Sequence, residues 1–297
     1  MYLLGKVTPF IGHKKFILVK LYIVPLAVHK KSNQNPTTMR KGGFKVRLIL
    51  GVVIVAFAYL RKCSQQTENP YTGKTQSISL TPAQEIAIGL QQKPSMAQQH
   101  GGFHSNAQYQ QYVTHIGQQL VNNTVAKNSG YQFEFHLLRD DRTINAFALP
   151  GGQIFITYAL FSKLTDSNGQ INPDMVAGVL GHEIGHVLGK HSNERITEAN
   201  FWQLLSMGAS VGADLGELAN SIGQQTLLKN GRGDELESDE LGVRLMLDAG
   251  YNPKYLINVM KILKQAAGPN RIPEFQSTHP DPENRIAKIK AAIKKYQ

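Results

Sequence analysis

Apolar and polar positions separate the chain into an apolar N-terminal run and a patterned remainder. Residues 48–60 form an uncharged apolar run of 13 residues. Apolar side chains recur at helical spacing in residues 109–123, and residues 131–140 alternate as in a β-strand. A second strand pattern in residues 145–161 is interrupted by Pro150 and the two glycines after it, which fits an edge strand better than a central one.

Two further helices are predicted after these strands. One begins at Asn172 and Pro173, a typical helix start, and continues past residue 186. The other includes Asp234 and ends near Gly250. Helices, a small sheet and further helices in this order predict an α+β domain. It is mainly helical, with a small β-sheet and an edge strand, and an N-terminal hydrophobic segment precedes it.

Positive charge is concentrated at the N-terminus. The 297 residues carry a formal net charge of +11, but residues 1–62 contain 12 of the 32 Lys and Arg and none of the 21 Asp and Glu. The rest of the chain is nearly balanced, with 20 basic and 21 acidic residues. No nucleic-acid partner is expected, because nucleic-acid binding would need a basic face on the folded domain.

Residues 1–62 are predicted to be a basic, hydrophobic targeting or membrane-anchor region. Thirteen apolar residues are short for a membrane span, which needs about 20, but flanking basic side chains could extend the run by snorkelling. A cleaved signal is an equal alternative, since Ala56 and Ala58 form an A-x-A pattern. Most of the basic residues of this region precede the run, which predicts a cytoplasmic N-terminus and places the rest of the chain on the other side of the membrane. Met39 is the functional start if residues 1–38 are an upstream extension.

The remaining chain is divided into a polar linker, residues 63–80, and one domain, residues 81–297. The single cysteine, Cys63, excludes an internal disulfide framework and a cysteine-rich zinc module. Any metal must therefore be bound by histidines and carboxylates.

His182 and His186 are the first candidate metal ligands. Four residues apart on a helix, they differ by about 40° around the axis, so both imidazoles can bind one ion. Glu183 lies about 100° from His182, beside the metal, where it can act as a general base on water. Residue 192 is serine, whereas a metzincin would need histidine there.

Glu235 is the predicted third ligand, from the second helix. Asp239 lies one turn further on the same face, where it can accept a hydrogen bond from the non-metal nitrogen of a histidine ligand. Two histidines, one glutamate and an open position are typical of a catalytic Zn²⁺ site, with one ion per chain. Glu237, Glu240 and Arg244 are expected on the opposite face.

Glycine is unusually frequent around the two histidines. Gly178, Gly181, Gly185 and Gly189 fall on one stripe of the helix, although each glycine costs helix stability relative to alanine. Such a stripe permits the close approach of another backbone, and we expect it to be the helix that carries Glu235.

The segments that carry this site have recognisable sequences: "GHEIGHVLGKHSNER", "RGDELESDELG", "NAFALPGGQIFI" and "STHPDPENRI". In them the chain resembles metallopeptidase family forty-eight, the gluzincin HExxH zinc endopeptidases that include HtpX, the CAAX prenyl endopeptidase and BepA-type quality-control proteases. The resemblance runs from about residue 69 to the end and extends to the quality-control branch. It implies a zincin-type catalytic domain in residues 81–297.

The resemblance also implies roles for other residues. An extended substrate would lie along the edge strand, marked by Asn145, Ala146, Gly151 and Gly152, in the manner of β-augmentation. His279 and Arg285 would sit near the cleft, with His279 catalytic, stabilising the oxyanion, or gating the metal. The alternative is that this segment is a capped loop before the last helix. The other histidines, including His191, are treated as non-ligands.

The sequence therefore predicts a zinc metalloendopeptidase of the bacterial envelope, periplasmic or anchored in the inner membrane, that hydrolyses misfolded or membrane proteins. Two alternatives are a metal-binding chaperone or adaptor with little turnover, and a membrane-surface scaffold. Residues 196–228 are expected to form a helical flap or pair over the cleft, or else core packing. Asp214 and Glu217 argue against a membrane span there. Polypeptides and the membrane are the expected partners, and no oligomeric state is predicted.

Overall fold

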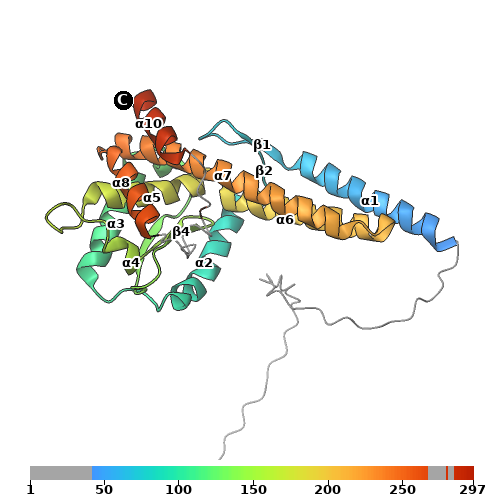
Figure 1. The fold of residues 1–297 in the computed structure, drawn as a ribbon, viewed down its shortest axis with the longest axis horizontal. Coiled ribbons are helices and arrows are strands. Elements are labelled where there is room, and N and C mark those ends of the chain that lie inside the picture. The colour runs from blue at the N-terminus through green and yellow to red at the C-terminus, as the bar shows by residue number, and fades with distance from the viewer. Residues whose placement is uncertain (1–41, 267–278, 280–283) are drawn as a thin grey trace, which may run out of the picture. The chain divides into compact units, whose positions relative to one another are not determined.

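The computed structural model describes residues 42–266, 279 and 284–297, which all belong to one compact unit beginning at Lys41 (Figure 1). The expectations for residues 1–38 and Met39 lie outside the described residues. Within the described part the protein is mainly helical with two small sheets and an apolar N-terminal helix. This confirms the predicted α+β class.

Helix α1, Gly42–Ser64, extends the apolar run at both ends. Its residues Gly43–Ser64 are long and apolar enough to cross a membrane, with a mean hydropathy of 2.0. Large apolar side chains cover its surface and are mostly exposed, among them Ile49 and Leu60 at 65% and 71%. By length and composition α1 is therefore a candidate membrane span.

Helices α6, His191–Ala213, and α7, Gly216–Asp248, form a long antiparallel hairpin beside α1 (Figure 1). The backbones of α1 and α6 approach closely, since a Cβ added to Gly51 would lie 2.6 Å from the carbonyl oxygen of Gly208. Residues 196–228 are thus paired helices as expected. They pack along α1, where the small residues Gly208 and Gly212 of α6 admit the α1 backbone.

Strands β1, Gln66–Glu68, and β2, Thr75–Ser77, pair antiparallel within the segment expected to be a linker. Asn69 donates a hydrogen bond to the carbonyl of Leu188 at 2.9 Å. Gln76 donates to the carbonyl of Gly189 at 2.6 Å. These two hydrogen bonds therefore attach the hairpin to the C-terminal end of helix α5, Pro173–Leu188.

The main sheet has three strands in the order β3-β5-β4. Strands β3, Glu134–Leu138, and β5, Gln153–Thr157, are parallel, whereas β4, Ala146–Leu149, runs antiparallel to β5. The expected edge strand is β4 alone, and β5 is central and fully buried. Pro150 and the two glycines form the turn between them, because Gly151 and Gly152 adopt φ angles of +81° and +108° that suit glycine.

Helix α5, Pro173–Leu188, crosses the middle of the core and carries the predicted histidine pair. Asn172 caps it by accepting a hydrogen bond from the Met175 amide at 3.1 Å. Buried apolar side chains from α5, the main sheet and the surrounding helices form one cluster. The other elements are α2 Pro82–Gln99, α3 Ala107–Asn122, the 3₁₀ turn η1 Val125–Asn128, α4 Tyr158–Phe161, α8 Lys254–Ala266 and α10 Arg285–Tyr296.

Candidate metal centre

The two histidines of α5 point to one spot. Because they are one turn apart, His182 and His186 lie on the same helix face, and their Nε2 atoms are 3.1 Å apart. Both side chains are largely buried, with 3% and 10% exposed. Two imidazole nitrogens thus converge inside the protein.

Helix α7 brings Glu235 to this spot from 49 residues further along the chain than His186. Its Oε2 lies 3.3 Å from Nε2 of His182, and its Oε1 lies 3.4 Å from Nε2 of His186. His279 joins them, with Nδ1 3.1 Å from Oε1 of Glu235. One ligand atom from each of these four buried residues lies within 4.8 Å of the others.

Glycines allow α7 to approach α5. A Cβ on Gly185 would lie 2.9 Å from the carbonyl oxygen of Ser238. A Cβ on Gly181 would lie 3.4 Å from that of Gly242, so these two glycines face α7 as expected. The other two glycines of the stripe have different neighbours: Gly178 faces Leu256 of α8, and Gly189 faces the ring of His191.

Asp239 and Arg285 support His182 from behind. Oδ1 of Asp239 lies 2.9 Å from Nδ1 of His182. Arg285 donates to both Asp239 oxygens, from Nε at 2.7 Å and from Nη2 at 2.8 Å. Burial by itself would raise the pKa of Asp239, but the adjacent Arg285 guanidinium lowers it. The carboxylate is therefore ionised and accepts the Nδ1 proton of His182, which leaves Nε2 directed at Glu235.

The pKa values of the cluster residues are shifted in different directions. Burial opposes a charged His182, but hydrogen bonds to Asp239 and Glu235 outweigh it and raise the pKa of His182 to about 9. Burial lowers the pKa of His186 well below its ordinary value. Burial would raise the pKa of Glu235, yet His279 and His186 hold that pKa well below its usual range.

Glu183 is buried beside the cluster without a hydrogen bond. It is 1% exposed, and neither carboxylate oxygen has a hydrogen-bond partner among the described residues. Oε1 lies 3.5 Å from Nε2 of His279. Burial raises the pKa of this carboxyl. A buried glutamate of this kind requires a polar neighbour beyond the described side chains.

The donor set fits a zinc ion. Imidazole nitrogens and a carboxylate oxygen are the ligands that Zn²⁺ takes in catalytic sites, with one position left open. The unsatisfied oxygens of Glu183 lie at the same cluster, as expected for a group that acts on water beside the metal.

His279 also connects the cluster to the edge strand. Its Nε2 lies 3.1 Å from the carbonyl oxygen of Ala146, the first residue of β4. The neighbouring Asn145 pairs with Thr157, which donates to the Asn145 carbonyl at 3.0 Å. Gly151 and Gly152 lie in the turn after the other end of β4, against α2 and residues 132–133. Of the four residues predicted to mark the substrate strand, Ala146 contacts the cluster through His279, and Gly151 lines a small pocket together with His186.

His191 contacts His186, a neighbour that the sequence analysis did not predict for it. It is 2% exposed, and its Nδ1 lies 2.9 Å from Nδ1 of His186. The cluster of possible metal ligands among the described residues does not include it. A signal was present in the sequence, because His191 follows His186 by five residues across a glycine that ends the helix.

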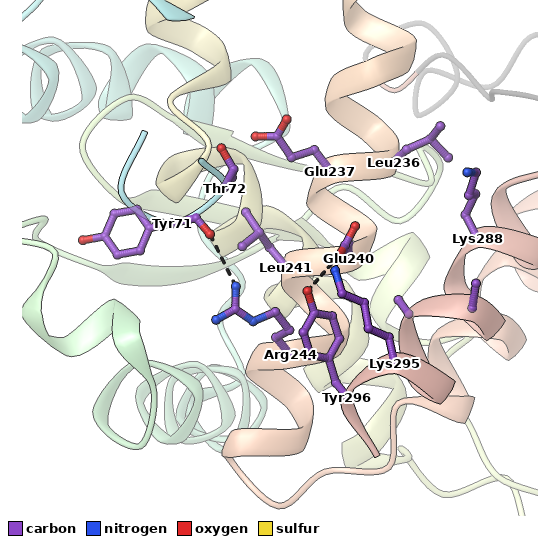
Figure 2. A pocket seen from close by; sticks show the side chains of 12 residues that line it. Tyr71, Thr72, Leu236, Glu237, Glu240, Leu241, Arg244, Lys288, Lys295 and Tyr296 are labelled. Atoms are coloured by element: carbon purple, nitrogen blue, oxygen red, sulfur yellow. Dashed lines mark hydrogen bonds and ion pairs between the residues drawn. The ribbon is translucent and has the colours of Figure 1, made fainter. Parts of the chain in front are cut away.

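A pocket of about 490 Å³ lies on the other face of α7, between α10 and the turn of the β1–β2 hairpin (Figure 2). Glu237, Glu240 and Arg244 line it, as expected for the face opposite Glu235. Arg244 donates to the carbonyl of Tyr71 at 3.4 Å, and Glu240 accepts a hydrogen bond from Tyr296 at 2.7 Å (Figure 2). None of the predicted site residues lines this pocket.

A histidine pair on one helix, a glutamate from a second helix and a further buried glutamate are the attributes of a metal-dependent hydrolase. The chain belongs to peptidase family M48, whose model matches residues 107–293, more than half of the chain. The predicted family is thereby confirmed.

Curated relatives carry protease names. The beta-barrel assembly-enhancing protease of Escherichia coli (strain K12) is 31% identical over 192 residues, which cover 60% of this chain and 37% of that protein. The protein of the same name from Yersinia pestis is 30% identical over 190 residues, with the same coverage. The mitochondrial metalloendopeptidase OMA1 of Schizosaccharomyces pombe is 30% identical over 189 residues, covering 63% of this chain and 53% of that protein. The chain thus spans between about a third and a half of these relatives.

Proposed function

We propose that the protein is a zinc-dependent endopeptidase in which His182, His186 and Glu235 hold one Zn²⁺ ion. The observation that carries this proposal is the contact of Glu235 with both histidines from a separate helix. Helix packing alone does not require a buried glutamate beside two buried imidazoles. All three side chains nevertheless direct a ligand atom to one point. The family and the named relatives support a metalloendopeptidase.

When bound, the zinc ion supplies Lewis acidity that polarises the scissile carbonyl and acidifies a water molecule. Glu183 removes one proton from the attacking water, and the oxygen of that water forms a bond to the carbonyl carbon. The C–N bond then breaks, and Glu183 returns the proton to the leaving amine. Its burial and raised pKa suit a group that must both accept and release a proton. No covalent enzyme intermediate is formed.

His279 is proposed to assist this reaction. Its two ring nitrogens lie 3.1 Å from Glu235 and 3.5 Å from Glu183, so the ring is beside both the proposed ligand and the proposed base. An N–H group of this ring directed at the carbonyl oxygen would stabilise negative charge there. Gating of the metal by the same ring is the second possibility, favoured by its direct contact with Glu235.

The proposed substrate is an extended polypeptide that pairs with the free edge of β4. This edge is open in the sheet order, and its first residue, Ala146, lies at the cluster through His279. Main-chain pairing binds a strand without regard to most side chains. Such a mode suits misfolded or misassembled envelope proteins, in keeping with the name of the bacterial relatives.

Helix α1 is proposed to anchor the domain in a membrane. Its ends carry basic residues, with Arg47 paired to Asp214 at 3.0 Å and Lys62 to Glu198 at 3.3 Å, and residues 48–60 of the helix are uncharged. The excess of basic residues before α1 favours a cytoplasmic N-terminus and a catalytic domain on the non-cytoplasmic side, in the periplasm of a bacterium.

A casein digestion assay with the purified full-length chain tests the enzymatic proposal. Hydrolysis should require zinc, stop with a chelator and be lost in Glu183→Gln, which keeps the size of the side chain but cannot take up a proton. Equal, low activity in both proteins, with zinc retained, would favour the alternative of a metal-binding chaperone or adaptor.

A further inference from the structure

His186 uses its two ring nitrogens in two directions. Nε2 lies 3.4 Å from Oε1 of Glu235, within the cluster. Nδ1 lies 2.9 Å from Nδ1 of His191, whose side chain is 2% exposed. The two rings are nearly perpendicular, at 81°, so this is an edge contact between nitrogens and not a stack.

The turn between α5 and α6 is shaped to bring His191 back to His186. Lys190 adopts a left-handed conformation with φ of 56°, and α6 starts at the next residue. A residue other than glycine costs about 1 kcal/mol or more in this conformation. Gly189 has no side chain, and a Cβ there would collide with the His191 ring. Both features allow the His191 imidazole to lie against His186.

The far side of His191 is held by acidic and basic side chains. Its Nε2 lies 3.5 Å from Oε1 of Glu237 on α7. Lys74, from the turn of the β1–β2 hairpin, lies 3.8 Å from the other Glu237 oxygen and 3.2 Å from Glu194. On the near side, Oγ of Ser238 lies 3.3 Å from Nδ1 of His191.

Hydrogen-bond chemistry determines the protonation of both rings. A histidine that binds a metal through Nε2 is neutral and carries its proton on Nδ1. Nδ1 of His186 must then donate, and Nδ1 of His191 must accept. A neutral His191 with a free Nδ1 carries its own proton on Nε2, which faces the Glu237 carboxylate.

We propose that His191 is a positioning residue for His186. It accepts the Nδ1 proton of His186 and so holds the ring with its Nε2 lone pair directed at the metal position, while the opposite nitrogen of His191 lies 3.5 Å from the Glu237 carboxylate without a hydrogen bond. For His182 the corresponding acceptor of the Nδ1 proton is a carboxylate, that of Asp239. The two proposed ligands therefore differ in their supporting acceptor, a carboxylate for one and a neutral imidazole for the other. This inference rests on the proposed zinc site.

Zinc affinity of the full-length chain, measured by competition with a chromogenic chelator, tests the proposal. In His191→Phe the acceptor is lost and the dissociation constant should rise about 10–100-fold, the usual effect of removing such a partner. In His191→Asn the amide oxygen can replace Nδ1 as acceptor, and most of the affinity should return. His115→Phe, at an exposed histidine on α3, is the matched control and should bind as the native chain does.

The zinc-binding results separate a failure of this inference from a failure of the proposed function, and an NMR measurement covers a variant that does not fold. If the native chain binds no zinc, the proposed function fails; if it binds zinc and a folded His191→Phe binds equally well, only this inference is overturned. ¹⁵N NMR of the histidines in the zinc-loaded native chain covers the case of a variant that does not fold. The proton should be found on Nδ1 of His186 and on Nε2 of His191. The reverse assignment at His191 would overturn the inference.

Discussion

Arg285 and Asp239 form a bidentate ion pair in the interior, with donor–acceptor distances of 2.7 and 2.8 Å and exposed side-chain fractions of 4% and 1%. The pair joins α10 to α7 directly behind the His182 ring. Because both charges are removed from water, each needs compensation inside the protein, which this pair supplies together with the contacts of Arg285 with Glu235 and of Asp239 with His182. The last helix of the chain is thereby tied to the candidate metal centre.

Asp239→Asn should lower the free energy of unfolding by about 3–5 kcal/mol, because it removes the charge of the bidentate partner of the buried Arg285, which then keeps the longer ion pair with Glu235 at 3.4 Å. It should also weaken zinc binding, since the acceptor for His182 Nδ1–H loses its charge. Urea unfolding and chelator competition measure the two effects. Glu240→Gln is the control: its ion pair with Lys295 is exposed, and its loss should cost no more than about 1 kcal/mol. Equal effects of the two variants would contradict the importance of the interior pair.

Gly185→Ala should destabilise the protein, whereas Gly178→Ala should not. Added to Gly185, a Cβ meets the Ser238 carbonyl at 2.9 Å, and overpacking of this kind costs about 1–3 kcal/mol. At Gly178 the nearest atoms belong to Leu256 at 3.4 Å, so alanine should gain up to about 1 kcal/mol of helix propensity. Thermal unfolding of both variants decides the matter. A neutral Gly185→Ala would show that α5 and α7 need not approach so closely.

Glu183→Gln should stabilise the metal-free protein, increasingly so as the pH rises. Burial raises the pKa of Glu183 in the folded state above its unfolded value near 4.5. The folded state then binds more protons than the unfolded state, and stability is lost as the pH rises through the folded pKa. Glutamine removes that loss. Unfolding of chelator-treated native and variant chains between pH 4 and 8 should give curves that coincide in acid and diverge above it. A constant difference would contradict the raised pKa.

The mature protein should retain α1. Gly51 packs against the Gly208 backbone, and removal of the chain up to Ala58 would uncover that face of α6. Intact-mass analysis of protein isolated from membranes should therefore find a chain that includes residues 48–60. A mature N-terminus at Tyr59 would instead support the cleaved signal.

The local part of the site was predictable from spacing. Helical periodicity alone puts His182 beside His186 and Asp239 on the face of Glu235, because each pair is four residues apart in one helix. That the two helices meet was indicated by Gly181 and Gly185, whose missing side chains mark a close approach. The structure brings these residues together through that contact.

The strand order, the β1–β2 hairpin and the position of His191 could not be predicted from residue spacing, because they depend on contacts between distant parts of the chain and on backbone conformation. The central position of β5 follows from a glycine turn that reverses the chain, and the β1–β2 hairpin is held by side-chain bonds from Asn69 and Gln76 to carbonyls more than 100 residues away. His191 reaches His186 only because Lys190 adopts a left-handed conformation. Asp214, which argued against a membrane location, has a partner in Arg47 of α1.

The zinc site itself is tested most directly by anomalous diffraction at the zinc absorption edge from crystals of the full-length chain. A single peak surrounded by Nε2 of His182, Nε2 of His186 and a carboxylate oxygen of Glu235 is the predicted result. A peak elsewhere, or zinc-loaded crystals in which Glu235 takes no part in binding the ion, would contradict the account.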